Sequence, residues 1–497
     1  MRALLFLLLA SPILCQKYTG NQLVFQQSPE QQKRVAIIGG GAAGTSAAFW
    51  LKNAFENTDI DLHTTLYESS HRLGGRTMTT PVKGDPALGV IEVGASIFVE
   101  ANHNLMNATK QFGLNRTTLA AQKQKLGVWD GQNFLFQETG STYWDGVKFL
   151  WRYGSSPLKA NRHLDTVLER FELLYENDAL PYYSIEEAFE GVGIYELLNT
   201  SAQEYLESRM GVNTIFSEEI VQSATRANYG QDIDTLHALG AMVSLAAKNS
   251  WSIQGGNFKI FEEFAERSGA EIRMETTVKK VEKIHDKQGG YTVTTNNGDT
   301  QIYDAVILAA PFNPNEILEL PVSTGSYVRD YKIVHVTLLA GYPDPSYFSS
   351  TENDVPNLII TTGNGLPNAF SKSTAPFTTF AVHRILENGE SIVKIFSSTE
   401  LKEELLDQLF YNRTWTYHQA WNAFPVLHPN TDSKSSWPPI IIDGFENPGL
   451  GGLIYVNAFE SAISTMETQT IASKNAAKIL HTEWCTSTLC RPFGDGW

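Results

Sequence analysis

Cysteine is almost absent from this sequence, with three residues in a chain of 497. Cys15 follows an apolar N-terminal run, so we expect the mature chain to keep only Cys485 and Cys490. Neither has the spacing of a metal-ligand set or a redox motif, and we predict no metal site. The two are close enough in sequence to form a disulfide in an oxidising compartment; the alternative is two unrelated thiols.

Basic charge is also scarce, because 38 Lys and Arg stand against 54 Asp and Glu, a formal net charge of −16. A nucleic-acid partner would need clustered basic charge, and so would docking on anionic lipid, so this balance argues against both. The 42% hydrophobic and 11% aromatic shares are typical of a well-buried globular protein. The length predicts two or more lobes.

Long apolar runs are missing except at the N-terminus. Arg2 precedes the apolar residues 3–10, and the pattern up to Cys15 is that of a signal peptide, which we place at residues 1–15. The run is shorter than the roughly 20 residues of a membrane span, which disfavours an uncleaved anchor. We predict no membrane span in the mature chain.

Four Asn-x-Ser/Thr sequences are consistent with secretion. The candidate glycosylation sites are Asn107, Asn115, Asn199 and Asn412, and each would have to lie on the surface. Together with the signal peptide, they predict the secretory pathway, with a lysosome or vacuole or the extracellular space as destination.

The apolar pattern predicts strands near both ends of the mature chain and helices between them. A strand at 34–38, a glycine-rich turn, a helix at 45–55 and a strand at 61–68 form a βαβ unit. Residues 102–236 have mostly helical periodicity. Further strands are expected at 271–274, 276–284, 291–295, 305–309, within 330–400 and at 451–456, and further helices at 400–409 and 465–484.

The turn of the βαβ unit carries a dinucleotide fingerprint, Gly39-x-Gly41-x-x-Gly44. The first glycine permits the tight turn, the second lets the backbone approach a pyrophosphate, and the third lets the helix pack on the strand. Glu68 ends the second strand, where its carboxylate can accept ribose hydroxyls and disfavours a 2′-phosphate.

A second motif, His71-Arg72-Leu73-Gly74-Gly75-Arg76, follows directly. It resembles the motif by the FAD pyrophosphate in glutathione-reductase-like, amine-oxidase-related flavoproteins. The resemblance implies that Gly75 lets the backbone close over FAD and that Arg76 neutralises phosphate charge; the alternative is an ordinary surface arginine. Later segments resemble the same family and imply that the Val278 backbone holds adenine and that the segment containing Glu460 binds FAD. There is no Cys near this C-terminal flavin segment placed for a covalent link, so we expect noncovalent FAD.

Four segments narrow the resemblance: Trp151-Arg152-Tyr153-Gly154, Arg226-Ala227-Asn228-Tyr229-Gly230-Gln231, Gln254-Gly255-Gly256-Asn257 and Val393-Lys394-Ile395-Phe396-Ser397. They are similar to the prenylcysteine oxidase family, also called prenylcysteine lyases, and the similarity runs from about residue 35 to residue 484.

That resemblance implies oxidative cleavage of a thioether, farnesyl- or geranylgeranyl-cysteine. A hydride leaves the carbon beside sulfur, water adds, and a prenyl aldehyde and free cysteine separate, while oxygen becomes hydrogen peroxide. The implied substrate site is a long apolar tunnel with a polar end. Arg226 and Arg152 are candidates for binding the substrate carboxylate, with structural ion pairs as the alternative, and Tyr229 and Gln231 are candidates for facing the flavin. No catalytic side chain can be named from the sequence.

The resulting fold class is α/β, with a Rossmann-like FAD-binding lobe interleaved with a mixed sheet-plus-helical substrate lobe. We assign 33–85, 240–312 and 445–485 to the FAD-binding lobe and 86–239 and 313–444 to the substrate lobe.

Three other functions remain open at this point. One is a secreted FAD-dependent amine oxidase, which the Asn-Tyr-Gly-Gln block disfavours. Another is a non-catalytic FAD-containing lipid-binding protein, and the third is a carotenoid-desaturase-like enzyme, which the secretory signal disfavours.

Overall fold

The βαβ unit at the start of the described chain forms where its sequence predicts. β1 (Gln31–Ile38) and β2 (Ile60–Tyr67) pair in parallel, and α1 (Ala42–Phe55) connects them. The computed structural model describes residues 31–118, 125–176, 180–247, 250–285, 289–312, 318–322, 329–349, 355–363, 375–430, 437–445, 449–485, 493 and 497. The predicted signal peptide therefore lies outside the described residues.

A six-stranded sheet gathers segments from both ends of the chain. Its order is β19-β20-β13-β1-β2-β9, and all neighbours are parallel except β19 and β20. The added strands are β9 (Glu271–Arg273), β13 (Ala305–Leu308), β19 (Ile441–Gly444) and β20 (Gly452–Tyr455). Because parallel strands end at one edge, the residues that follow β1, β2, β13 and β20 meet there.

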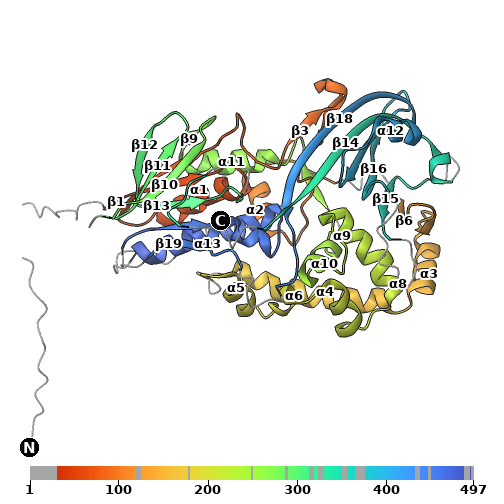
Figure 1. Cartoon of the computed structure of the whole chain (residues 1–497), viewed down its shortest axis with the longest axis horizontal. Helices are drawn as coiled ribbons and strands as arrows, with labels where there is room; N and C mark the ends of the chain where they lie inside the picture. The colour runs from red at the N-terminus through yellow and green to blue at the C-terminus, as the bar shows by residue number, and fades with distance from the viewer. Residues whose placement is uncertain are drawn as a thin grey trace, which may run out of the picture.

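Helices cover this sheet and fix its position. α1 packs against α11 (Phe258–Ser268) and α13 (Met466–Trp484), and α2 (His103–Gln111) contacts both of these. In α13, 16 of 19 residues are buried, so this helix is enclosed on nearly all sides. Its N-terminal end faces the second half of the molecule (Figure 1).

The second half is built on a seven-stranded sheet in the order β18-β14-β17-β16-β15-β6-β7. Its strands are β6 (Leu126–Trp129), β7 (Phe134–Gln137), β14 (Tyr331–Pro343), β15 (Leu358–Thr361), β16 (Thr379–Ile385), β17 (Ser391–Ser397) and β18 (Phe410–Pro425). Figure 1 shows this sheet beside the six-stranded sheet, with a group of helices below it.

Those helices come mainly from the middle of the chain. They are α3 (Thr142–Tyr153), α4 (Ser156–Glu172), α5 (Ile185–Gly191), α6 (Glu196–Asn199), α7 (Ala202–Glu204), α8 (Thr214–Phe216), α9 (Gln222–Tyr229) and α10 (Ala238–Leu245). A further α-helix is α12 (Glu403–Leu409). Further strands form a three-stranded sheet of β10 (Val278–Lys283), β11 (Tyr291–Thr295) and β12 (Thr300–Tyr303). Two strand pairs complete the β-structure, β3 (Thr79–Pro81) with β4 (Val90–Glu92) and β5 (Arg116–Thr118) with β8 (Trp251–Ile253).

The predicted α/β class, with two interleaved lobes, is confirmed, but some boundaries differ. β19 pairs with β20 in the six-stranded sheet, although the sequence placed residues 441–444 in the substrate lobe. α10 packs against α4, α6, α7 and α9, so residues 240–245 belong with the helices rather than with the sheet that follows. β6 and β7 interrupt the predicted helical middle because they complete a sheet whose other strands come after residue 330.

Among the described residues, every helix is too short or too polar to cross a membrane.

Candidate functional site

A cavity of about 1200 Å³ lies at the junction of the two halves. This exceeds the roughly 300–1000 Å³ of a typical single-ligand site, so it can hold a dinucleotide and a substrate together. Glycine-rich loops after β1 and β2 form one wall, and apolar side chains of α4 and α10 form another. The two walls therefore differ in chemistry, one polar and the other apolar.

The first glycine loop leaves the start of α1 open to the cavity. Gly41 is the residue before the helix, and no side chain of the described residues caps the helix there, so the first N–H groups of α1 need another partner. Gly39 has φ of 109°, and a Cβ there would lie 2.8 Å from the Ala309 carbonyl oxygen. A Cβ on Gly44 would lie 1.8 Å from the Gly39 oxygen. A phosphate at this helix N-terminus would satisfy the open N–H groups.

The second glycine loop closes against the first. The N–H of Gly74 donates to the Gly40 oxygen at 2.9 Å, and a Cβ on Gly75 would lie 3.1 Å from the Gly41 Cα. The Arg72 guanidinium donates to the Gly75 oxygen at 2.7 Å and so holds the loop from within. The two loops form one cradle that any side chain would narrow.

Glu68 lies between the loops at the end of β2. Its side-chain oxygens accept hydrogen bonds from the N–H groups of Gly40 and Ser70, both at 2.7 Å. The carboxylate is therefore fixed in the cavity wall, where it can also accept the ribose hydroxyls of a dinucleotide.

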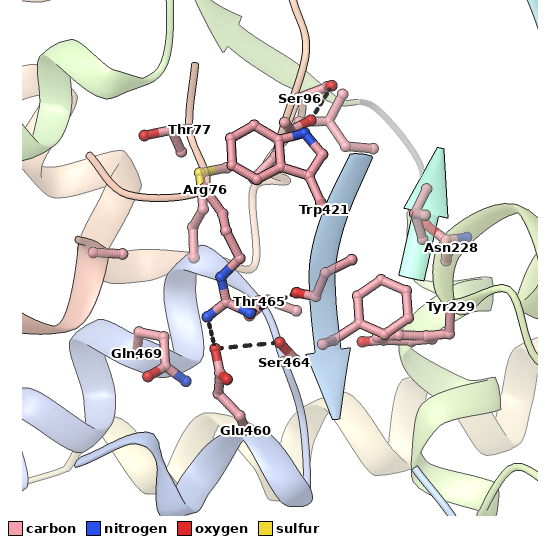
Figure 2. Close-up of a pocket in the computed structure, with 18 of the residues that line it drawn as sticks. Arg76, Thr77, Ser96, Asn228, Tyr229, Trp421, Glu460, Ser464, Thr465 and Gln469 are labelled. Carbon is pink, nitrogen blue, oxygen red and sulfur yellow. Dashed lines mark hydrogen bonds and ion pairs between the residues drawn. The ribbon is translucent and has the colours of Figure 1, made fainter. Parts of the chain in front are cut away.

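Arg76 forms an ion pair with Glu460, which is 1% exposed. Figure 2 shows the guanidinium reaching the carboxylate, with a second contact from Glu460 to Ser464. Arg76 also donates to the Ala423 oxygen, and the Tyr331 hydroxyl donates to Glu460 at 2.9 Å. Although burial opposes its charge, the neighbouring Glu460 carboxylate raises the pKa of Arg76.

The far end of the cavity offers polar atoms that lack partners. Asn457 and Gln469 line the cavity, and their side chains carry buried atoms without a hydrogen bond among the described residues. Gln469 lies in the first turn of α13, whose N-terminal cap is Thr465 (Figure 2). The polar heterocycle of a flavin would fit this end, while its phosphates would fit the glycine cradle.

Lys394 is a cavity residue whose role sequence reasoning missed. Its ammonium group, from β17, donates to the Glu92 backbone oxygen at 2.9 Å and to the Ser96 hydroxyl at 2.5 Å. Burial lowers the pKa of Lys394 to about 8. The available signal was a lysine inside the strand Val-Lys-Ile-Phe, where its neighbours are apolar.

Two predicted substrate residues line the cavity. Arg226 lies on α9 with an 11% exposed side chain, and its nearest acidic partner is Asp232 at 3.5 Å. Its Nε atom is buried without a hydrogen bond among the described residues. Tyr229 is buried beside it and packs edge-on against Phe424.

The other two predicted substrate residues are corrected by their contacts. Arg152 makes a two-pronged ion pair with Glu219, at 2.7 and 2.6 Å, and lies outside the cavity wall. Gln231 is buried and accepts the Leu427 N–H at 2.9 Å, so it holds the chain after β18 rather than facing the cavity. The local sequence around Arg152 and Gln231 does not reveal that Glu219 and the Leu427 N–H are their partners.

The remaining predicted positions have varied outcomes. Val278 begins β10 and lies outside the cavity lining, so its contact with adenine stays a prediction. Among the candidate glycosylation sites, Asn107, Asn115 and Asn412 are exposed, and Asn199 is half-buried. Cys485 is disulfide-bonded, and its predicted partner Cys490 lies outside the described residues.

Comparison with known proteins decides the family. The family described as prenylcysteine lyase matches residues 136–490, and a family of NAD(P)-binding Rossmann-like domains matches residues 37–112. The chain belongs to the prenylcysteine lyase family. It is 28% identical to a farnesylcysteine lyase of Arabidopsis thaliana, over 97% of this chain and 94% of that protein. It is 27% identical to the human prenylcysteine oxidase 1, over 91% and 89%.

Solved structures show the fold. Cyclohexylamine oxidase from Brevibacterium oxydans aligns with a TM-score of 0.58 at 17% identity, over 91% of this chain and 99% of that one. Wild-type putrescine oxidase bound to putrescine aligns with a TM-score of 0.57 at 15% identity, over 90% and 99%. With the glycine cradle, Glu68 and the unpartnered polar atoms near α13, the fold and family identify the cofactor as FAD.

Two of the three fingerprint glycines, Gly41 and Gly44, are expected to respond differently to substitution. Among the described residues, a Cβ on Gly41 would meet only the Gly75 Cα, at 3.7 Å, so Gly41→Val should fold but fill the cradle and abolish FAD binding. Gly44→Ala should instead lower the melting temperature, because its Cβ overlaps the Gly39 oxygen. Flavin absorbance and thermal unfolding of both variants would check this, and yellow, FAD-loaded Gly41→Val protein would contradict the cofactor site.

Stability should depend on pH through Glu92. Burial raises the pKa of Glu92 from 4.5 to about 7, despite the opposing effects of the Asn257 N–H and the Lys394 charge. Between pH 4.5 and about pH 7, the Glu92 carboxyl is therefore protonated in the folded state and ionised in the unfolded state. The resulting stabilisation is complete at low pH and is lost as pH rises through about 7.

Glu92→Gln removes this titration and keeps an oxygen for the Asn257 N–H, which Glu92 now accepts at 2.6 Å. On going from pH 7 to pH 5, the wild type should gain more thermal stability than the variant. The contribution of Lys394 to stability changes with pH only above this pH range, because the pKa of Lys394 lies at about 8. The assignment would be refuted if the melting temperatures of the wild type and of Glu92→Gln rose by the same amount between pH 7 and pH 5.

Proposed function

We propose that this protein is an FAD-dependent oxidase that cleaves prenylcysteine to a prenyl aldehyde and free cysteine. The observation that carries the proposal is the two-sided cavity, in which a dinucleotide cradle opens onto an apolar chamber. For each substrate, one water and one oxygen molecule are consumed, and one hydrogen peroxide is formed. Bound FAD supplies the capacity to accept a hydride from the carbon beside sulfur and to pass two electrons to oxygen.

The apolar chamber supports an isoprenoid substrate. The lining side chains from α4 and α10 are apolar, and they are Leu164, Val167, Leu168, Phe171, Leu239, Met242 and Val243. Burying a prenyl chain against them gains about 25 cal/mol for each Å² of apolar surface removed from water. A short, cationic polyamine would need acidic partners or several aromatic rings, whereas these side chains of α4 and α10 include no acid and one ring, that of Phe171.

Arg226 is suited to bind the carboxylate at the cysteine end. Its side chain is almost fully buried in the cavity wall. Within the described part of the chain, its Nε has no hydrogen-bond partner, and the acidic residue that pairs with it, Asp232, has a 45% exposed side chain. Burial lowers the pKa of Arg226, and the Asp232 charge only partly offsets this. A substrate carboxylate would therefore compensate a guanidinium that the protein itself leaves poorly paired.

The chain's own residues position the substrate rather than supply an obvious base. Lys394 places a cation in the same cavity, held by Glu92 and Ser96, where it can stabilise developing negative charge. Trp421 donates to the Val93 oxygen at 3.0 Å and thereby ties β18 to the segment that carries Ser96. These contacts give the cavity fixed polar groups beside its apolar extension.

The cellular setting is part of the proposal. The N-terminal pattern at residues 1–15 and the exposed Asn107, Asn115 and Asn412 support a glycosylated protein of the secretory pathway, acting in a lysosome or vacuole or outside the cell. A melting temperature that rises toward acid pH would suit such a compartment.

The function is tested by measuring peroxide and free thiol released from farnesylcysteine, with putrescine as the comparison substrate. Equal yields of both products that require bound FAD are expected, with no peroxide from putrescine. Peroxide from putrescine alone would indicate an amine oxidase. Bound FAD and farnesylcysteine without turnover would indicate a lipid-binding protein.

Arg226→Leu is expected to raise KM for farnesylcysteine by roughly 10- to 100-fold, because a charge-assisted hydrogen bond contributes about 1.5–3 kcal/mol. S-farnesylcysteamine, which lacks the carboxylate, should show no difference between wild type and variant. Arg152→Leu is the matched control: it breaks a pair outside the cavity and should lower thermal stability with KM unchanged. Equal KM effects on both substrates would exclude Arg226 as the carboxylate partner.

A further inference from the structure

Helix α3 is apolar on two opposite faces. Its inner face packs Phe149 and Tyr153 against Phe136 and Phe216, and Tyr153 is fully buried. Its outer face carries Tyr143, Trp144, Val147, Leu150 and Trp151, at the i, i+1, i+4, i+7 and i+8 spacing of one helix side. A surface helix needs only one apolar face to pack against the protein core, so packing does not explain the apolar side chains of the outer face.

We define the α3 patch as the outer-face side chains together with Leu158 at the start of α4. Their exposed fractions are 72% for Tyr143, 61% for Trp144, 43% for Val147, 50% for Leu150, 87% for Trp151 and 64% for Leu158. These are six of the 14 exposed large hydrophobic residues in the described chain, and they fall within 16 consecutive positions. Such clustering marks an interaction surface, whereas scattered exposed residues do not.

The charge around the patch is opposite to that of the chain. Residues 142–163 contain four Lys or Arg and one acidic residue, Asp145, in a protein of net charge −16. Arg152 is neutralised by its ion pair with Glu219, which leaves Lys148, Lys159 and Arg162 as the cations of this segment. Asp145 is turned inward and accepts hydrogen bonds from Thr139 and Gly140, while Lys148 and Arg162 are exposed. The overall acidity that argued against lipid docking is thus reversed locally.

Aromatic residues with flanking cations are characteristic of surfaces that lie in the headgroup region of a membrane. Trp and Tyr place an apolar ring at the acyl boundary and a polar edge in water, and Lys and Arg contact phosphates. α4 follows α3 after residues 154–155, and its Leu164, Val167 and Leu168 line the apolar end of the cavity. The patch and the apolar chamber are therefore carried by consecutive helices.

We propose that the α3 patch docks the protein on a phospholipid surface, from which a membrane-partitioned substrate reaches the cavity. The inference rests on the proposed function, because a prenyl chain provides the reason for docking. α3 lies at the outer edge of the helical group, away from α13 and the six-stranded sheet (Figure 1). The patch can therefore lie on a flat surface while the half of the molecule built on the six-stranded sheet stays clear of that surface.

The test is co-sedimentation of FAD-loaded protein with phosphatidylcholine vesicles, with and without phosphatidylserine. We expect wild type to bind both, more strongly with phosphatidylserine at low salt, and Trp144→Ser/Trp151→Ser to bind at least tenfold more weakly. The matched control is Ile302→Ser/Ile385→Ser, which removes two apolar residues of 57% and 62% exposure outside the patch and should bind as wild type does. Wild type that stays in the supernatant, or equal binding by all three proteins, would overturn the proposal.

Two further measurements separate the alternatives. Light scattering without vesicles distinguishes a second copy of this chain as the occupant: a wild-type dimer that the Trp144/Trp151 variant makes monomeric would overturn membrane docking. Turnover of dissolved farnesylcysteine without vesicles should be equal in wild type and variant. Vesicle binding without any farnesylcysteine turnover would leave the docking surface in place and reject the proposed substrate.

Discussion

The pairing of Arg76 with Glu460 is the contact on which the site depends. It joins residues 384 positions apart in sequence, one just after the second glycine loop and the other just before α13. A carboxylate that is 1% exposed needs a compensating charge, and removing one partner of such a pair typically costs about 3–5 kcal/mol. Tyr331 on β14 and the Ala423 carbonyl of β18 join the same cluster, so the seven-stranded sheet is tied to it as well.

This cluster explains how two separate sheets produce one cavity. The cradle of glycines belongs to the six-stranded sheet, while the segments around Trp421 and Lys394 belong to the seven-stranded sheet. Their chemistry is complementary, because one side presents open N–H groups and the other presents a buried cation and apolar surface. The helices α4 and α10 extend the cavity away from the polar loops, which gives a long substrate a place to lie.

Prediction from sequence succeeded where the determining interactions are local. The βαβ unit, the two glycine loops and Glu68 are encoded within residues 31–75, and Gly39, Gly44 and Gly75 each have a steric reason at their own positions. It failed for Arg152 and Gln231, since their real partners are Glu219, 67 positions away, and the Leu427 N–H, 196 positions away. A motif can identify a family without revealing which of its side chains face the cavity.

The sequence by itself determined the dinucleotide-binding start, the α/β class and the membership in a flavoprotein family, because backbone sterics and apolar periodicity act over short distances. Only the tertiary structure decided that Lys394 is buried beside Glu92 and Ser96, that Arg226 lines the cavity and that α3 turns a second apolar face outward. These are properties of burial and of charge pairing, and both depend on which distant segments the fold brings together.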